Sequence, residues 1–141
     1  QDPTSKMSKS DADENAYILI LDEPDVIRRK IKRAVTDSVG EVHYTDEQPG
    51  VKNLLDIYCS FKHVTPEEAE KEFAQSGYGE LKEAVAEAVV EGLAPVQARY
   101  KEIREDKEML ESICRSGAEK ASRLAQRTLR KVYRKVGFAQ F

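Results

Sequence analysis

The sequence predicts an all-α protein: a helical bundle of about six helices, preceded by a flexible loop and a short extended segment. Apolar residues recur at helical spacing over most of the chain, and proline and glycine fall where helices are expected to start and end. With 40% hydrophobic and 35% charged residues, the composition is that of a helix-rich protein. A length of 141 residues is enough for one domain with a real core.

The first apolar segment is a continuous run at residues 16–21. Its length predicts a short buried strand, with extended coil as the alternative. The run Asp22-Glu23-Pro24 then supplies an N-cap acid and an early proline, which predict the start of a helix. The inner face of that helix is expected to consist of Ile27, Ile31, Ala34 and Val35. Its other faces carry a basic cluster, either a solvated surface or a phosphate contact: Arg28, Arg29, Lys30, Lys32 and Arg33.

Two helices follow in the middle of the chain. The first is predicted by apolar residues at positions i, i+3, i+4 and i+7: Val51, Leu54, Leu55 and Tyr58. The second begins with Thr65 as N-cap, Pro66 at the first position and Glu68 as the capping-box acid. It is expected to pack Ala69 and Phe73 inward.

The longest predicted helix starts near Tyr78 and continues across Pro95, where the missing backbone N–H should bend it. Gly92 would allow another helix to approach closely. Asp106 is predicted to cap a shorter helix, and a last helix to start at Ser116 or Gly117 and end at Gly137. The expected inner stripe of that last helix is Ala118, Ala121, Ala125, Thr128, Val132 and Val136.

Charge is distributed unevenly along the chain. The formal net charge is -3, yet residues 117–141 carry +6, which leaves -9 for the residues before them. Basic side chains collected on one terminal helix suit an RNA backbone, and a solvated helix face is the alternative. The candidate RNA contacts are Arg123, Arg127, Arg130 and Arg134.

Membrane and metal functions are not expected. The longest uncharged apolar run is too short to cross a bilayer, and no secretory signal is visible, so a cytoplasmic protein is predicted. The two cysteines, Cys59 and Cys114, and the two histidines, His43 and His63, are scattered rather than closely paired. No metal site is therefore predicted, and the cysteines are expected to be buried free thiols.

A short segment near the beginning carries two lysines separated by two residues. Lys6 and Lys9 place two ammonium groups together, and Ser8 and Ser10 add small hydrogen-bond donors. Lysine acts as a mobile point charge for phosphate oxygens, so the segment could bind polyphosphate. Because the surrounding residues are polar and rich in turn formers, a disordered tail is the alternative.

Residues 2–10, which read DPTSKMSKS, resemble the second signature, KMSKS, of the class I aminoacyl-tRNA synthetases. The rest of the chain resembles the C-terminal portion of the bacterial-type tryptophanyl-tRNA synthetases, nearly end to end. The segments that carry this resemblance, in order, are residues 31–38, 49–58, 77–82, 93–100 and 117–121. Ala12 stands where relatives often have proline, which implies a slightly less stiff loop.

The resemblance implies activation of tryptophan with ATP and transfer of the aminoacyl group to tRNA(Trp). Lys6 and Lys9 would be the catalytic lysines, neutralising the triphosphate as pyrophosphate departs. Met7, Ser8 and Ser10 would complete the ATP-binding loop and help it close. Residues 1–21 would come from the end of the catalytic domain, and residues 22–141 would form the anticodon-binding domain. The family further implies Mg²⁺ with the ATP and a homodimer of the full-length enzyme.

The family's first signature, an HIGH-like sequence, has no counterpart here, since neither His43 nor His63 lies in one. The resemblance therefore implies that the chain is a C-terminal part of the enzyme, which alone binds no cofactor tightly and forms no adenylate. Its expected partner is tRNA rather than DNA. Two alternatives remain: a non-catalytic helical RNA-binding module, and a protein-interaction module.

Overall fold

The computed structural model describes residues 2–6, 8 and 10–138, which form helices and connecting coil without any strand. A short 3-10 helix, η1 (Glu14–Ala16), precedes five α-helices: α1 (Pro24–Lys32), α2 (Pro49–Lys62), α3 (Pro66–Glu72), α4 (Tyr78–Glu105) and α5 (Lys107–Val136). The chain divides into two compact units, Gln1–Ala98 and Arg99–Phe141. The predicted all-α class is confirmed.

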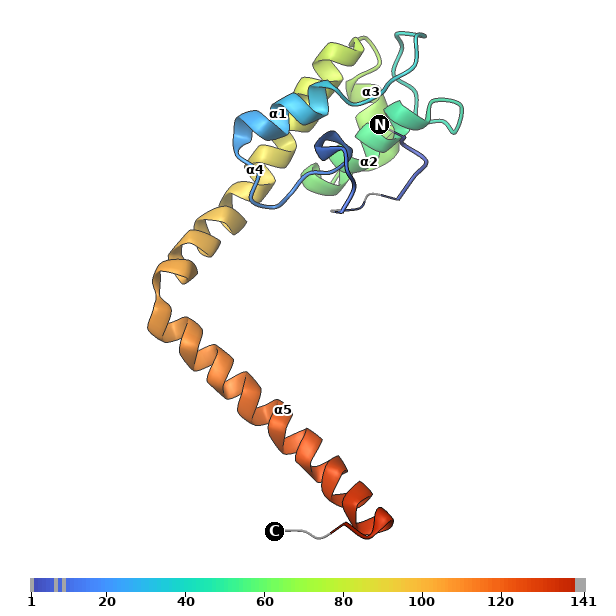
Figure 1. Ribbon diagram of the computed structural model, residues 1–141. Helices are drawn as coiled ribbons and strands as arrows, with labels where there is room; N and C mark the ends of the chain where they lie inside the picture. The colour runs from blue at the N-terminus through green and yellow to red at the C-terminus, as the bar shows by residue number, and fades with distance from the viewer. Residues whose placement is uncertain (1, 7, 9, 139–141) are drawn as a thin grey trace. The chain divides into compact units, whose positions relative to one another are not determined.

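The first unit contains the hydrophobic core. Helices α1, α2 and α3 gather around the first half of α4 (Figure 1). Most of the inward positions predicted from periodicity are buried, whereas Val35 is 46% exposed because α1 has ended before it. The core residues are Ile27, Ile31, Val42, Val51, Leu54, Leu55, Tyr58, Ala69, Phe73, Leu81, Val85, Ala86, Ala88 and Val89.

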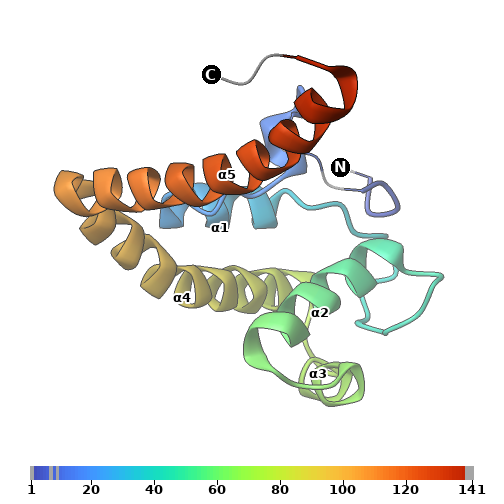
Figure 2. The same ribbon diagram turned by 90° about the horizontal axis from the view of Figure 1, so that it is seen from below.

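Helix α3 lies beside α2 (Figure 2). The Tyr58 ring packs edge to face on Phe73, with centroids 5.1 Å apart, and the Tyr58 hydroxyl donates to Glu72 at 2.9 Å. The capping box at the start of α3 is formed as predicted: Thr65 Oγ1 accepts from the Glu68 N–H, and Glu68 accepts from the Thr65 N–H.

Helix α4 is held to both α1 and α2. The Arg28 guanidinium donates to Glu87 at 2.6 Å, and Lys62 donates to Glu91 at 2.7 Å. The ring of Phe61 lies so close to Gly92 that a Cβ at that position would be 2.2 Å from it. The prediction that Gly92 permits a close approach is confirmed, and α4 continues across Pro95 as predicted.

The strand predicted at residues 16–21 is wrong, and the alternative of extended coil is correct. Ala16 ends η1, and the residues after it run as coil into α1. Leu19, Ile20 and Leu21 are 44%, 58% and 46% exposed. A strand needs a neighbouring strand to satisfy its backbone, and none lies within the part of the chain that the structure describes.

The second unit contains α5, which is one helix rather than the two predicted. Asp106 caps it by accepting from the Met109 N–H at 2.9 Å, and Gly137 ends it in the left-handed conformation, both as predicted. Ser116 and Gly117 lie inside the helix, because a single glycine weakens a helix without ending it. None of the residues of α5, all of which are described, is buried, so the predicted inner stripe is not covered within this unit.

Candidate functional site

Three residues of the KMSKS sequence are described by the structure, and all three lie on the surface. Lys6, Ser8 and Ser10 are exposed, whereas the predicted site residues Met7 and Lys9 lie outside the described residues. Ser8 organises a turn: its Oγ accepts from the Ser10 N–H at 3.3 Å and its carbonyl accepts from the Asp11 N–H at 3.1 Å. An exposed ammonium group beside a hydrogen-bonded turn is able to meet a polyphosphate from solvent.

Local turns continue from this segment to η1. Asp11 Oδ1 accepts from the Asp13 N–H, and Asp13 Oδ1 accepts from the Asn15 N–H, both at 2.9 Å. The first of these Asx turns encloses Ala12, and the second follows it. Side-chain hydrogen bonds therefore restrict the backbone around Ala12.

Residues 17–22 form a connecting segment between these turns and α1. The Asp22 carboxylate accepts from Lys30 Nζ at 2.7 Å and from the Leu19 N–H at 3.0 Å. Lys30 Nζ also lies 5.0 Å from the centroid of the Tyr17 ring. The side chains of Lys30 and Asp22 are only 6% and 12% exposed, so this ion pair is largely screened from water.

The expectation of an N-cap acid before α1 is met by Glu23 and not by Asp22, and Glu23 makes no side-chain cap hydrogen bond. The basic cluster of α1 is not uniformly a surface either, because Lys30 is buried and Arg28 is paired with Glu87.

The connecting segment is also tied to α4. Gln97 Nε2 donates to the carbonyl oxygens of Ile20 at 2.8 Å and Asp22 at 3.0 Å. Ile18 packs against the core, but Leu19, Ile20 and Leu21 are exposed, so polar contacts from α1 and α4 hold this part of the segment in place. Nothing in the spacing of the sequence indicated these contacts, since Gln97 and Ile20 are 77 positions apart.

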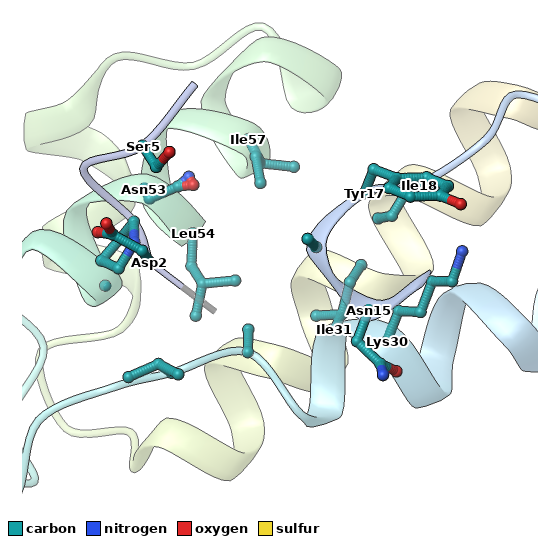
Figure 3. Close-up of a pocket in the computed structure, with 15 residues that line it drawn as sticks. Asp2, Ser5, Asn15, Tyr17, Ile18, Lys30, Ile31, Asn53, Leu54 and Ile57 are labelled. Atoms are coloured by element: carbon teal, nitrogen blue, oxygen red, sulfur yellow. The ribbon is translucent and has the colours of Figure 1, made fainter. Parts of the chain in front are cut away.

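A cavity of about 320 Å³ lies between the connecting segment and α2 (Figure 3). Asn53, Leu54 and Ile57 of α2, with Asp2 and Ser5, line one side; Tyr17 and Ile18, with Lys30 and Ile31 of α1, line the other. Among the described lining residues Lys30 is the only cation, and Asp22 already neutralises it. The cavity therefore does not suit a polyphosphate.

The second unit contains the candidate RNA surface. The four predicted arginines follow one another at three- or four-residue intervals along α5 and are exposed. They line one shallow hollow of about 490 Å³: Arg123, Arg127, Arg130 and Arg134, with Gln126 and Lys131. The structure thus brings together all four predicted residues and adds two that the same helical spacing could have identified.

Several titratable groups with a shifted pKa lie away from the KMSKS sequence, among them Asp37, His43 and Cys59. The pKa of Asp37 is lowered by the hydrogen bond from Tyr78, and the pKa of His43 is raised by its contacts with Glu41 and Glu70. Desolvation raises the pKa of the Cys59 thiol. The shifts of Asp37 and His43 therefore arise from partners within the helical unit.

The expectation about the cysteines is partly wrong, because Cys59 is half-buried and Cys114 is exposed on α5, where no second helix of its unit covers it. Across the described ranges, no group of three or more His, Cys, Asp or Glu side chains is arranged to hold a metal ion. Nor is any described helix both long and apolar enough to cross a membrane.

Comparison with known proteins defines the class. Residues 1–94 match the family model described as "tRNA synthetases class I (W and Y)", and the chain belongs to that family. The chain is 59% identical to a tryptophan–tRNA ligase of Clostridium perfringens over 137 residues, covering 97% of the chain, and 49% identical to that of Clostridium tetani, covering 98%. It spans 41% of the length of each of these relatives.

A solved structure supports the same assignment. The crystal structure of tryptophanyl-tRNA synthetase from Mycoplasma pneumoniae matches 98% of this chain and 42% of its own, with a TM-score of 0.79 and 30% sequence identity. The resemblance to the C-terminal portion of the tryptophanyl-tRNA synthetases is thereby confirmed.

Proposed function

We propose that this chain is the part of a tryptophan–tRNA ligase that supplies the KMSKS loop for ATP and the surface for tRNA(Trp). The observation that carries the proposal is the unaltered KMSKS sequence at residues 6–10, in a chain whose relatives are tryptophan–tRNA ligases over almost its whole length. Residues 1–21 would complete the catalytic domain, and residues 22–141 would bind the anticodon region. The whole enzyme would be a cytoplasmic homodimer.

The chemistry assigned to the lysines is electrostatic. As the tryptophan carboxylate attacks the α-phosphorus of ATP, negative charge builds on the departing pyrophosphate. Lys6 and Lys9 would stabilise that charge, and the hydroxyls of Ser8 and Ser10 would donate further hydrogen bonds. Neither lysine needs to give up its proton, so no general acid or base is assigned to this segment.

Mg²⁺ would accompany the ATP phosphates. Such an ion is usually held by phosphate and water oxygens with only one or two protein carboxylates, so no Mg²⁺ ligand is assigned to this chain. The ion would neutralise part of the negative charge of the triphosphate, and Lys6 and Lys9 would stabilise the negative charge that is left.

The test is tryptophan-dependent exchange between pyrophosphate and ATP in a full-length ligase that carries this chain. Replacing both Lys6 and Lys9 with alanine should lower the exchange rate at least about a hundredfold, because charge stabilisation of the leaving group is lost. Lys71→Ala, which removes an exposed ammonium group from α3, is the matched control and should leave the rate within about twofold. An unchanged rate in the double variant would refute the catalytic assignment.

The alternative is a non-catalytic helical module that binds RNA or protein and whose N-terminal lysines form a tail. It is favoured only by the polar residues around the signature, and the match to the ligases extends through that region. The chain alone is expected to form no adenylate, since it contains no HIGH-like signature. Adenylate formed by the purified 141-residue chain would contradict this expectation.

A further inference from the structure

The connecting segment, residues 17–22, is held against α1 largely by polar contacts. Leu19, Ile20 and Leu21 are exposed and contribute little burial, so hydrophobic packing holds this segment only at its start, where Ile18 packs against the core, and does not fix residues 19–21. Instead, Lys30 reaches out of α1 to Asp22 at 2.7 Å, and the same Asp22 oxygen accepts from the Leu19 N–H at 3.0 Å. The Asp22 N–H also donates to the Leu19 carbonyl at 3.0 Å, so the turn formed by residues 19–22 is closed through Asp22, and the buried Lys30 ammonium group attaches that turn to α1.

The turns between Ser8 and Ala16 connect this segment to the KMSKS sequence. Local hydrogen bonds link Ser8 to Asp11, Asp11 to Asp13 and Asp13 to Ala16, through the side chains of Ser8, Asp11 and Asp13 and the backbone carbonyls of Ser8 and Asp13. Tyr17, the first residue after η1, packs its ring against the Lys30 ammonium at 5.0 Å. A displacement of residues 17–22 would therefore be passed through these turns to Ser10 and Ser8 of the KMSKS sequence rather than being absorbed by free coil.

We infer that Lys30 is a positioning residue for the KMSKS loop: its buried contacts with Asp22 and Tyr17 set where the loop leaves the helical unit. This inference rests on the proposed function. Lys30 would not touch ATP, because it faces the connecting segment and its charge is neutralised by Asp22. Its effect would be on the alignment of Lys6 and Lys9 with the leaving group, to which transition-state stabilisation is sensitive.

The first measurement uses the 141-residue chain and is independent of catalysis. In Lys30→Met, which keeps the length of the side chain and removes the charge, amide exchange at Leu19 should be about tenfold faster, because Asp22 loses its charged partner. Lys30→Arg should restore part of the protection. Lys71→Met, the same change at an exposed site on α3, should have no effect at Leu19.

The second measurement follows pyrophosphate exchange in a full-length ligase that carries the chain. Lys30→Met should lower kcat about tenfold and leave the KM for tryptophan within about twofold, since only alignment with the triphosphate is disturbed. If the single variant fails to fold by circular dichroism, the double variant Asp22→Asn with Lys30→Met replaces it, because it leaves no unpaired buried charge.

The outcomes separate the two proposals. Unchanged Leu19 exchange, unchanged kcat, or an equal loss in Lys71→Met would overturn the role of Lys30. A ligase that exchanges pyrophosphate equally well without Lys6 and Lys9 would overturn the proposed function instead, and Leu19 exchange would still show whether Lys30 holds the segment.

Discussion

Gly50, at the start of α2, lies directly against the backbone of Val35: a Cβ at position 50 would be 2.2 Å from the Val35 carbonyl oxygen. This contact brings the coil after α1 onto the first turn of α2, beside the cavity of Figure 3. The carbonyl belongs to the backbone, so it cannot swing away as a side chain would.

Gly50→Ala is therefore expected to destabilise the protein by about 1–3 kcal/mol, since the backbone near Val35 must shift to admit a methyl group. The free energy of unfolding, measured in urea, tests this. Gly79→Ala is the matched control: a Cβ there meets no atom within 4 Å, so the change should be neutral or slightly stabilising in α4. Equal stability of the two variants would contradict the contact.

Thr65 contributes stability through the cap of α3. Thr65→Ala removes the oxygen that accepts from the Glu68 N–H and should cost about 1 kcal/mol. Thr65→Ser keeps that oxygen and should recover most of the loss. Thr128→Ala, at an exposed position inside α5, should have almost no effect on the unfolding free energy.

The local stability of the structure around His43 is expected to depend on pH. Its contacts with Glu70 at 3.2 Å and Glu41 at 3.3 Å raise its pKa above 6.5, the value for the free side chain. The stabilisation that protonated His43 contributes to the fold is therefore fully present below pH 6.5. It is lost as the pH rises through the pKa of His43 in the folded protein. Protection of the Tyr44 N–H, which donates to Glu70, should fall as pH rises from about 6 to 8, and His43→Gln should abolish this change. A pH profile that is the same in both proteins would exclude His43 as its origin.

The basic hollow on α5 predicts salt-sensitive binding of tRNA(Trp). Replacing Arg127 and Arg130 with glutamate should weaken binding at least about tenfold and flatten the dependence of log Kd on log salt, because phosphate contacts that release counterions are lost. Filter binding or fluorescence anisotropy at several salt concentrations measures both quantities.

The control for this experiment makes the same charge change elsewhere on α5. Lys107 and Arg115 lie toward the other end of the helix, where Arg115 shares a hollow with three glutamates: Glu108, Glu111 and Glu119. Replacing both with glutamate should alter the affinity by less than about threefold. Equal losses in the two variants would show that net charge alone, and not the hollow, determines binding.

The sequence by itself determined the features that depend on neighbours within one or two helical turns. The Thr65 cap, the inward face of α2 and the ends of α5 at Asp106 and Gly137 were all correctly predicted, because capping and periodicity act over three to seven residues. The KMSKS sequence could likewise be read directly, as could the four arginines that share one face of α5.

Only the tertiary structure decided what depends on residues distant in the chain. The run at residues 16–21 is coil because no described strand lies beside it, and Lys30 is buried because Asp22 and Tyr17 surround it. Gln97 holds the connecting segment from 77 positions away. Burial and partner choice are properties of the packed chain, so the residues that position the KMSKS segment have no local signature, whereas those of the KMSKS sequence itself do.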